Sequence, residues 1–293
     1  MLIRTGFDIR FETEVAVPML ALLNVRPERQ SDLRTPEVVS SSPDVPMRQF
    51  IDPFGNVCSR FTVPPGGIAL HTDFVIEDSG EPDPVAPDAQ QHPLEDLPYD
   101  VLQYLMSSRY CEVSLLADEA WSVAQDKKSG WERVQALVDA AHERIEFDYM
   151  KASSERTARS AFDERFGVCR DFAHLAITLC RAINVPARYC TGYLGDIGIE
   201  PIDAPMDFSA WFEAYLGGKW YSFDARHNCP RIARIVMARG RDATDAAITT
   251  SFGAAKLVHF HVHTDEVAST DLSRPPSETA LQQQAVTATS IGS

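Results

Sequence analysis

The stretch RFGVCRDFAHLAITLCRAINVPARY, residues 165–189, decides how this chain can fold. Cys169 stands just past a glycine-containing turn, where an amphipathic helix begins. Asn184 and Pro186 are residues that end a helix. Apolar side chains recur between these points at helical spacing, and they form a stripe of Phe172, Ala176, Leu179, Cys180 and Ile183. We therefore expect a buried helix that starts at the cysteine.

The elements around this helix predict an antiparallel sheet covered by other helices. In DFSAWFEAYLGGKWYSFDARHN, residues 207–228, two glycines separate two strand-like runs, which is a strong hairpin signal. The run ARYCTGYL before them predicts a further strand. YDVLQYLMSSRY, ADEAWSVAQ and WERVQALVDAAHERIEFDY predict helices, and the last has an apolar face of Val134, Leu137, Val138, Ala141 and Ile145. The second half of the chain is therefore predicted to be α+β.

The first half has a different pattern. Residues 1–77 contain the alternating runs LIRTGFDIRFET, VCSRFTV and GIALHTDFVIED, and their frequent prolines disfavour long helices. We predict an N-terminal antiparallel β-sandwich. Residues 78–98, acidic and rich in proline, predict a linker or surface strap. The second domain is then expected over residues 99–265, followed by a disordered tail, rich in Ser, Thr, Gln and Ala, over 266–293.

The charge of the chain disfavours several classes of partner. The 293 residues carry a formal net charge of -15, which argues against nucleic-acid binding. The basic cluster RHNCPRIARIVMARGRD, residues 226–242, is interpreted as an ordinary helix with arginines on its exposed face. No apolar run reaches the roughly 20 residues that span a membrane, and the start lacks a signal-peptide core. We expect a soluble cytoplasmic protein with no membrane or nucleic-acid partner.

Cys169 is placed where nucleophilic chemistry would need it. The start of a helix has unpaired N–H groups and a partial positive charge, which favour a thiolate and lower the pKa of a thiol. The same N–H groups can stabilise an oxyanion. The alternative is a small residue tolerated at a helix start. The six cysteines include no C-x-x-C pair and are too few for a disulfide scaffold of this size.

These motifs resemble a known family. GVCRDFAHLAITLCRAINVPARYCTGYL followed by AWFEAYLGGKWYSFDA is similar to the core of the transglutaminase-like superfamily, papain-like thiol enzymes that include bacterial cysteine proteases. The β-rich first half resembles the N-terminal region that often accompanies this domain in bacteria. The resemblance implies that Cys169 is the nucleophile, that Asp224 orients the base, and that Trp211 is the aromatic residue of the substrate site.

The base of this family is absent from its usual position. Where the family pattern has His-Ala-Trp, this chain has Ser209-Ala210-Trp211, and a serine hydroxyl is no useful proton acceptor near neutral pH. His227 is a candidate surrogate. A continuing strand would place it on the face opposite Asp224, but a turn at ARHN could bring it back. The alternative is a loop histidine with local hydrogen bonds.

Other histidines have weaker claims. His174 follows Cys169 by five residues on one helix and so points about 140° away. His142 lies on an earlier helix and has no claim beyond its residue type. The alternating run KLVHFHVHTDE places three histidines on one strand face, where they could converge on zinc: His259, His261 and His263. We predict instead a half-buried strand and no metal, because no cysteine or acidic ligand accompanies them at a spacing typical of a metal site.

Two hypotheses of function remain open. The first is a thiol-dependent amide hydrolase or acyltransferase that acts on peptide or isopeptide carboxamides through a thioacyl intermediate on Cys169. In it Asp224 orients His227, Ser209 supplies only a hydrogen bond, no cofactor is required, and the partner is a peptide or protein substrate. The second is a catalytically degenerate binding or scaffolding module, because Ser209 replaces the base. Neither hypothesis includes a prediction of the oligomeric state.

Overall fold

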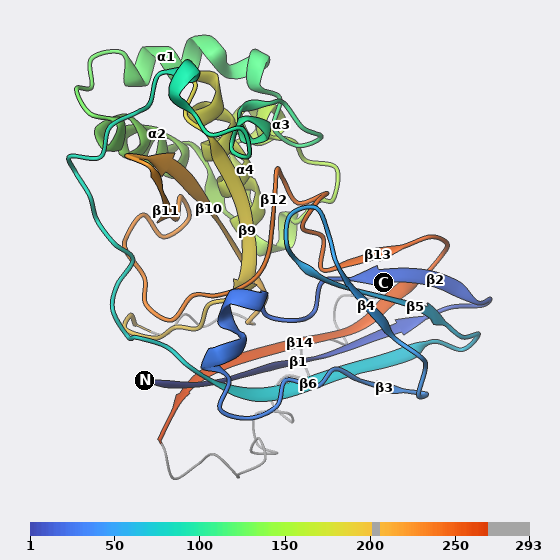
Figure 1. The fold of residues 1–293 in the computed structure, drawn as a ribbon. Coiled ribbons are helices and arrows are strands. Elements are labelled where there is room, and N and C mark those ends of the chain that lie inside the picture. Colours follow the sequence, from blue (N-terminus) through green and yellow to red (C-terminus); the bar gives the residue numbers. More distant parts are fainter. Residues whose placement is uncertain (201–205, 269–293) are drawn as a thin grey trace.

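The computed structural model describes residues 1–200 and 206–268 (Figure 1). The first half contains six strands, namely β1 (Leu2–Glu12), β2 (Val17–Ala21), β3 (Ser40–Ser42), β4 (Arg48–Ile51), β5 (Val57–Val63) and β6 (Ile68–Glu77). The helices of the second half are α1 (Ala117–Ala124), α2 (Gly130–Arg144), α3 (Ala158–Glu164) and α4 (Cys169–Ala182). Its strands are β7 (Glu146–Phe147), β8 (Phe166–Gly167), β9 (Ala187–Tyr193), β10 (Ser209–Leu216), β11 (Lys219–Phe223), β12 (Ile235–Gly240), β13 (Thr249–Ser251) and β14 (Lys256–Val267).

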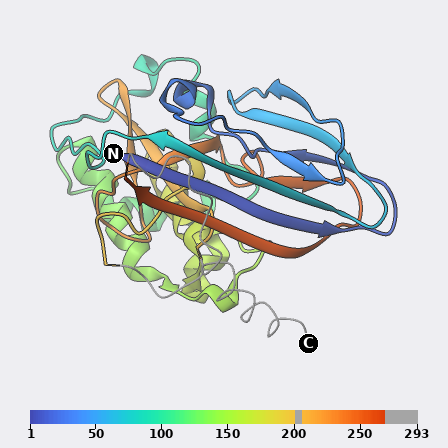
Figure 2. The ribbon, with the colours of Figure 1, turned by 90° about the horizontal axis from the view of Figure 1, so that it is seen from below.

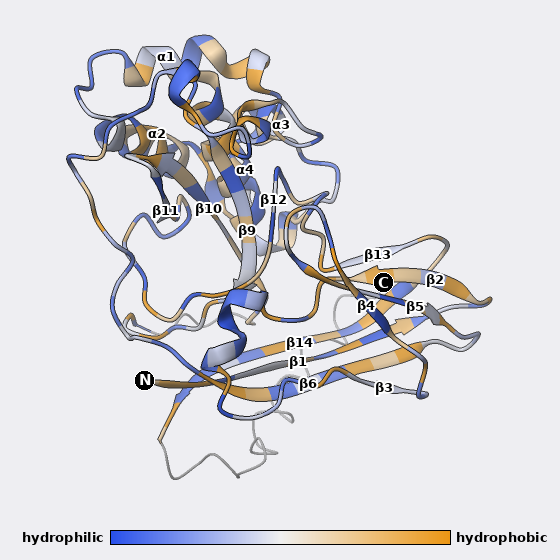
Figure 3. Ribbon diagram, viewed as in Figure 1, coloured by the Kyte–Doolittle hydropathy of each residue, from blue (hydrophilic) through white to orange (hydrophobic). Residues whose placement is uncertain are grey.

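Two four-stranded antiparallel sheets form the N-terminal part. Their strand orders are β14-β1-β6-β3 and β13-β2-β5-β4. Along β1 every second side chain turns inward, and Ile3, Phe7 and Ile9 share one apolar core with Met19 and Phe61 of the other sheet. Figure 3 shows hydrophobic residues along the strands of both sheets. The predicted antiparallel β architecture of the first half is therefore present.

β13 and β14, the last strands of the described residues, belong to these N-terminal sheets. β14 pairs with β1 from Leu2↔Val267 to Glu12↔Lys256, and Figure 2 shows β1 between β6 and β14. The sequence analysis instead extended the second domain to residue 265 and began a tail at 266. Pairing between the two ends of a chain leaves no local signal, which is why the boundary differs. The remainder of the predicted tail, residues 269–293, lies outside the described residues.

The second part packs helices on one antiparallel sheet, as predicted. The sheet has the order β11-β10-β9-β12, and α4 packs against β10 and β9. A capping box formed by Ser129 and Glu132 starts α2, and the whole apolar face predicted for this helix is buried. The run YDVLQYLMSSRY forms only a short 3-10 helix at Leu102–Leu105.

The basic cluster at residues 226–242 is not a helix, which corrects the sequence interpretation. Its second half is β12, antiparallel to β9. Ile235 and Met237 are buried in the core that the two N-terminal sheets share, so both parts of the chain contribute to one core. Arg239 forms an ion pair with Glu213 of β10 rather than facing solvent. The one arginine of β12 is therefore held by a carboxylate and does not contribute to an exposed basic surface.

The acidic segment 78–98 runs along the second part as a strap. Backbone hydrogen bonds join Asp83 N–H to Arg231 O, Trp131 N–H to Ala89 O and Gly217 N–H to Gln90 O. The strap therefore contacts the sheet, α2 and the segment before β12. Among the described residues, none of the helices combines the length and the apolar character needed to cross a membrane.

The contribution of β14 to the core can be tested with two matched substitutions. Val262 is 1% exposed, whereas Val258 on the same strand is 40% exposed. We expect Val262→Asp to lower the free energy of unfolding by about 3 kcal/mol or more, because it buries an unpaired charge. Val258→Asp is the control and should change it little. Thermal unfolding measures both, and equal melting temperatures would contradict the placement of β14.

Candidate active site

Asp171 fixes the start of the helix that carries Cys169. Its Oδ2 accepts a hydrogen bond from the Val168 N–H at 2.9 Å and another from Arg156 Nη1 at 3.3 Å. Gly167 makes this approach possible, because a Cβ there would lie 2.7 Å from Oδ2 of Asp171. The sequence analysis did not assign Asp171 a role. Its signal was an acidic residue in the first turn of the helix, where a carboxylate caps free N–H groups.

The chain turns immediately after β11 and brings His227 back to Asp224. Asp224 Oδ1 accepts the backbone N–H groups of Arg226 and His227, each at 3.0 Å. Asp224 Oδ2 lies 2.9 Å from His227 Nδ1. An ionised carboxylate only accepts hydrogen bonds, so Nδ1 carries the proton and Nε2 is the nitrogen able to accept one. The turn at ARHN that a surrogate base requires is thus present.

Cys169, Ser209 and His227 line one cavity of about 210 Å³. Asp224 lies behind His227 and is buried. Much of the cavity wall is apolar or aromatic, with side chains of Phe147, Tyr149, Val168, Leu194, Met206 and Phe208, and its charged members are Asp196, Asp207, Arg226 and Arg231. The cavity therefore places a thiol and a carboxylate-bound imidazole around one apolar space. This is the set of groups that nucleophilic attack on a carbonyl requires.

The surroundings of Cys169 oppose its ionisation. Burial and, after it, the nearby Asp207 carboxylate raise the pKa of the Cys169 thiol to about 11. Arg226 and the Ala210 backbone N–H act in the opposite direction but are outweighed. The helix start was expected to lower the pKa of the Cys169 thiol, whereas the structure raises it. The reason is that removal of the sulfur from water costs more than the helix start supplies.

Asp207 is itself affected by the cavity. Burial raises the pKa of this carboxyl to about 6, with the Phe208 backbone N–H, Tyr149 and Arg226 acting in the opposite direction. Asp207 is consequently ionised at neutral pH. Its negative charge then keeps the Cys169 thiol protonated until a base removes the proton.

Trp211 does not lie where the resemblance would place it. The sequence analysis assigned it to the substrate site, but it is 1% exposed and is not among the described residues that line the Cys169 cavity. Trp211 points to the face of β10 opposite α4, where it clusters with Cys190 and Val236. Ala210 and Phe212 occupy the face toward α4. Trp211 shares the face of Ser209 but lies two residues farther along β10, where Cys190 and Val236 pack against it.

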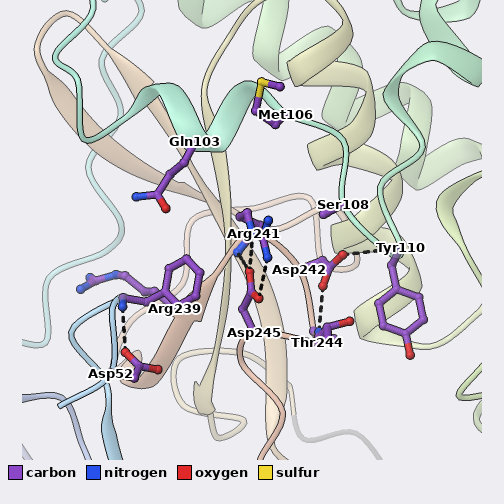
Figure 4. A network of polar contacts seen from close by, with 12 residues as sticks. Asp52, Gln103, Met106, Ser108, Tyr110, Arg239, Arg241, Asp242, Thr244 and Asp245 are labelled. Carbon is purple, nitrogen blue, oxygen red and sulfur yellow. Dashed lines mark hydrogen bonds and ion pairs between the residues drawn. The ribbon is translucent and has the colours of Figure 1, made fainter.

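His174 and His142 have structural surroundings. The buried ring of His174 stacks on Tyr110, and its Nε2 accepts the Ala243 N–H at 3.1 Å. Burial lowers the pKa of His174 to about 3. Figure 4 shows how Asp242 holds this region by accepting the N–H groups of Tyr110 and Thr244. His142 Nδ1 lies 3.0 Å from the Ala225 carbonyl oxygen. Neither histidine is among the described residues lining the Cys169 cavity.

The three histidines of β14 are engaged with β1 and β6. His263 Nε2 lies 3.0 Å from Asp73 Oδ1, and His259 Nε2 lies 3.6 Å from Asp8 Oδ1. The rings of His261 and His263 stack with centroids 6.0 Å apart. Across residues 1–200 and 206–268, no group of three His, Cys, Asp or Glu side chains is arranged to hold a metal ion. The zinc alternative therefore gains no support from the structure.

Comparison with known proteins identifies the second part of the chain. Residues 117–225 match the family described as "Transglutaminase-like superfamily". The match includes Cys169, Ser209 and Asp224 and ends before His227. An uncharacterized protein of Mycobacterium leprae is 30% identical over 119 residues, which is 39% of this chain and 42% of that protein. An uncharacterized protein of Mycobacterium tuberculosis is 35% identical over 127 residues, which is 38% of this chain and 40% of that protein. The matches span about two fifths of these relatives.

A solved structure extends the likeness to both parts of the chain. The crystal structure named "Putative Cysteine Protease" from Cytophaga hutchinsonii is 28% identical, with a TM-score of 0.79. The alignment covers 92% of this chain and 91% of that one. The fold of that protein is therefore similar over both the N-terminal sheets and the part of this chain that carries Cys169.

The effect of Asp207 on the thiol can be measured directly. We expect Asp207→Asn to lower the pKa of Cys169 by about one unit, because it removes a negative charge beside the sulfur. The rate of alkylation by iodoacetamide against pH reports this pKa. A Cys229→Ser background is needed because Cys229 is exposed. Asp44→Asn, at an exposed residue of the N-terminal part, is the control for net charge. An unchanged midpoint in Asp207→Asn would contradict the assignment.

Proposed function

We propose that this chain, which contains a transglutaminase-like domain, is a thiol-dependent amide hydrolase or acyltransferase whose nucleophile is Cys169. The observation that carries the proposal is the hydrogen bond between His227 and Asp224 at the cavity that contains the Cys169 thiol. This pair supplies a base although Ser209 occupies the family position of the histidine. The likeness to a chain named a cysteine protease supports the same class of reaction.

The proposed first half-reaction cleaves the amide. The Cys169 sulfur attacks the carbonyl carbon of a peptide or isopeptide while His227 Nε2 takes the thiol proton. Because the thiol pKa is about 11, removal of the proton must accompany the attack rather than precede it. Free N–H groups at the start of α4 stabilise the oxyanion. The carbon–nitrogen bond then breaks, His227 returns the proton to the leaving amine, and a thioester remains on Cys169.

The second half-reaction releases the acyl group. His227 takes a proton from water, which attacks the thioester and yields the acid, or from an amine, which yields a new amide. In both cases the sulfur leaves and recovers a proton from His227. Asp224 remains ionised throughout: burial would raise its pKa, but the His227 hydrogen bond and the Arg234 charge hold that pKa well below its usual range. Ser209 is 9% exposed at the start of β10 and contributes a hydrogen bond at most.

The competing function is a binding or scaffolding module that has lost its chemistry. Ser209 and the raised thiol pKa are the observations that favour it. The two functions differ in whether Cys169 can be acylated. p-Nitrophenyl acetate, an activated ester, reports this step without knowledge of the natural substrate. A thioacetyl group located on Cys169 by mass spectrometry supports the enzyme, and no acylation above the Cys169→Ala background supports the module.

The role of His227 gives the central prediction. We expect His227→Gln to slow acylation of Cys169 by about 10²- to 10⁴-fold, because it removes the general base. His71→Gln, an exposed histidine of β6, is the matched control and should react like the wild type. Burst kinetics with p-nitrophenyl acetate provide the rates. Equal acylation by His227→Gln and the wild type would eliminate His227 as the base.

Restoring the family residue at position 209 tests whether the base has moved. In the wild-type background, Ser209→His places a second imidazole in the cavity beside His227, and we expect no gain in acylation rate. In the His227→Gln background the same substitution should recover part of the lost rate, because a histidine then occupies the family position. A large gain from Ser209→His alone would instead indicate a site that lacks an effective base.

A further inference from the structure

Besides the imidazole of His227, the Asp224 carboxylate has a cationic neighbour. Arg234 Nη2 donates to Asp224 Oδ2 at 3.1 Å, the same oxygen that His227 contacts. The side chains of Asp224 and Arg234 are 2% and 7% exposed. The guanidinium therefore restrains the orientation of this oxygen, in a place that water reaches little.

Arg234 is held in turn by the strap. Its Nε donates to Asp83 Oδ2 at 2.8 Å, and the Arg231 backbone N–H donates to the same oxygen at 2.9 Å. The Asp83 N–H returns a hydrogen bond to the Arg231 carbonyl. The guanidinium carbon of Arg234 also lies 5.0 Å from the ring centroid of Trp211. These contacts restrain the guanidinium, and they give Trp211 a role behind the site rather than in it.

Acidic and basic side chains alternate along these contacts. Asp83, Arg234, Asp224 and His227 follow one another, each within hydrogen-bond distance of the next. Burial by itself would lower the pKa of Arg234, but the carboxylates of Asp224 and Asp83 more than offset this and raise it. Arg234 therefore stays charged. Neither Arg234 nor Asp83 is among the described residues that line the Cys169 cavity.

We propose that Arg234 and Asp83 are positioning residues of the active site, which makes the strap part of the catalytic apparatus. The inference rests on the proposed function, because it assigns Asp224 the task of orienting His227. Arg234 keeps the Asp224 carboxylate ionised and aimed at Nδ1, and Asp83 keeps Arg234 in place. The strap thus acts on the cavity from outside, through three successive side chains.

The test compares variants of two buried arginines that lie close together in the sequence. In Arg234→Gln, the acid limb of the pH–rate profile for Cys169 acylation by p-nitrophenyl acetate should move up by about one pH unit, because loss of the buried positive charge beside Asp224 makes protonation of the base His227 more favourable. Arg234→Lys keeps the charge and should recover part of the shift. Arg239→Gln removes an arginine of β12 whose side chain pairs with Glu213 and Glu28, so it controls for lost stability. We expect it to lower the melting temperature without moving the acid limb.

Two aspartates of the strap provide a second comparison. Asp83→Asn should move the acid limb in the same direction as Arg234→Gln but less far, since Arg234 remains. Asp88→Asn changes the same charge at an exposed residue of the same segment and should leave the profile at its wild-type position. A shift common to both variants would show that net charge, and not the contact with Arg234, is responsible, and would overturn the role of Asp83.

A spectroscopic readout separates this proposal from the proposed function. The Nδ1 proton of His227, hydrogen-bonded to a carboxylate, should give a low-field proton NMR signal that is absent from His227→Gln. This signal should change position as His227 Nε2 gains a proton, and in Arg234→Gln that change should occur about one pH unit higher than in the wild type. If wild-type Cys169 is not acylated while the signal shifts, the catalytic function fails and the positioning stands. If neither the signal nor the acid limb moves, the positioning role is overturned.

Discussion

A buried carboxylate must find hydrogen-bond donors, and at Asp224 this requirement organises the candidate site. The turn after β11 supplies two backbone donors, His227 supplies a third and Arg234 a fourth. Because the turn has to close around this carboxylate, the histidine that follows it is brought back toward the Cys169 cavity. The same requirement draws the segment before β12 inward, and with it the strap that holds Arg234. The arrangement of the site thus depends on the hydrogen bonds that one buried carboxylate requires.

The parts of the fold that were predicted from sequence depend on local pattern. Helix α4, the apolar face of α2 and the two-glycine hairpin each follow from periodicity or turn chemistry within a few residues. What could not be predicted depends on distant partners. The segment that forms β12 was interpreted as a helix because Ile232, Ile235 and Val236 suit a helical face, with the arginines expected in solvent. Arg239 of β12 instead pairs with Glu213 of β10 and with Glu28 of the N-terminal part. The domain boundary differed for the same reason, since β14 pairs with β1.

The candidate site divides in a similar way. The helix start at Cys169 and the possible turn at His227 could be inferred from residue order alone. The protonated resting state of the thiol could not, because desolvation by the cavity and the charge of Asp207 arise only after folding. Nor could the position of Trp211, which alternation along β10 directs away from α4. The motif therefore predicted which residues lie close together. The pKa of the Cys169 thiol, however, depends on residues that the motif does not contain.

The pairing of β1 with β14 also constrains the order in which this protein can be made. The first strand to be synthesised lies between β6 and a strand that is added more than 240 residues later. Until β14 emerges, β1 has an unpaired edge, and such edges pair readily with other chains. The N-terminal sheet therefore stays partly open until the residues between β1 and β14 have been synthesised. Its completion is a late, long-range step, of the kind that slows folding.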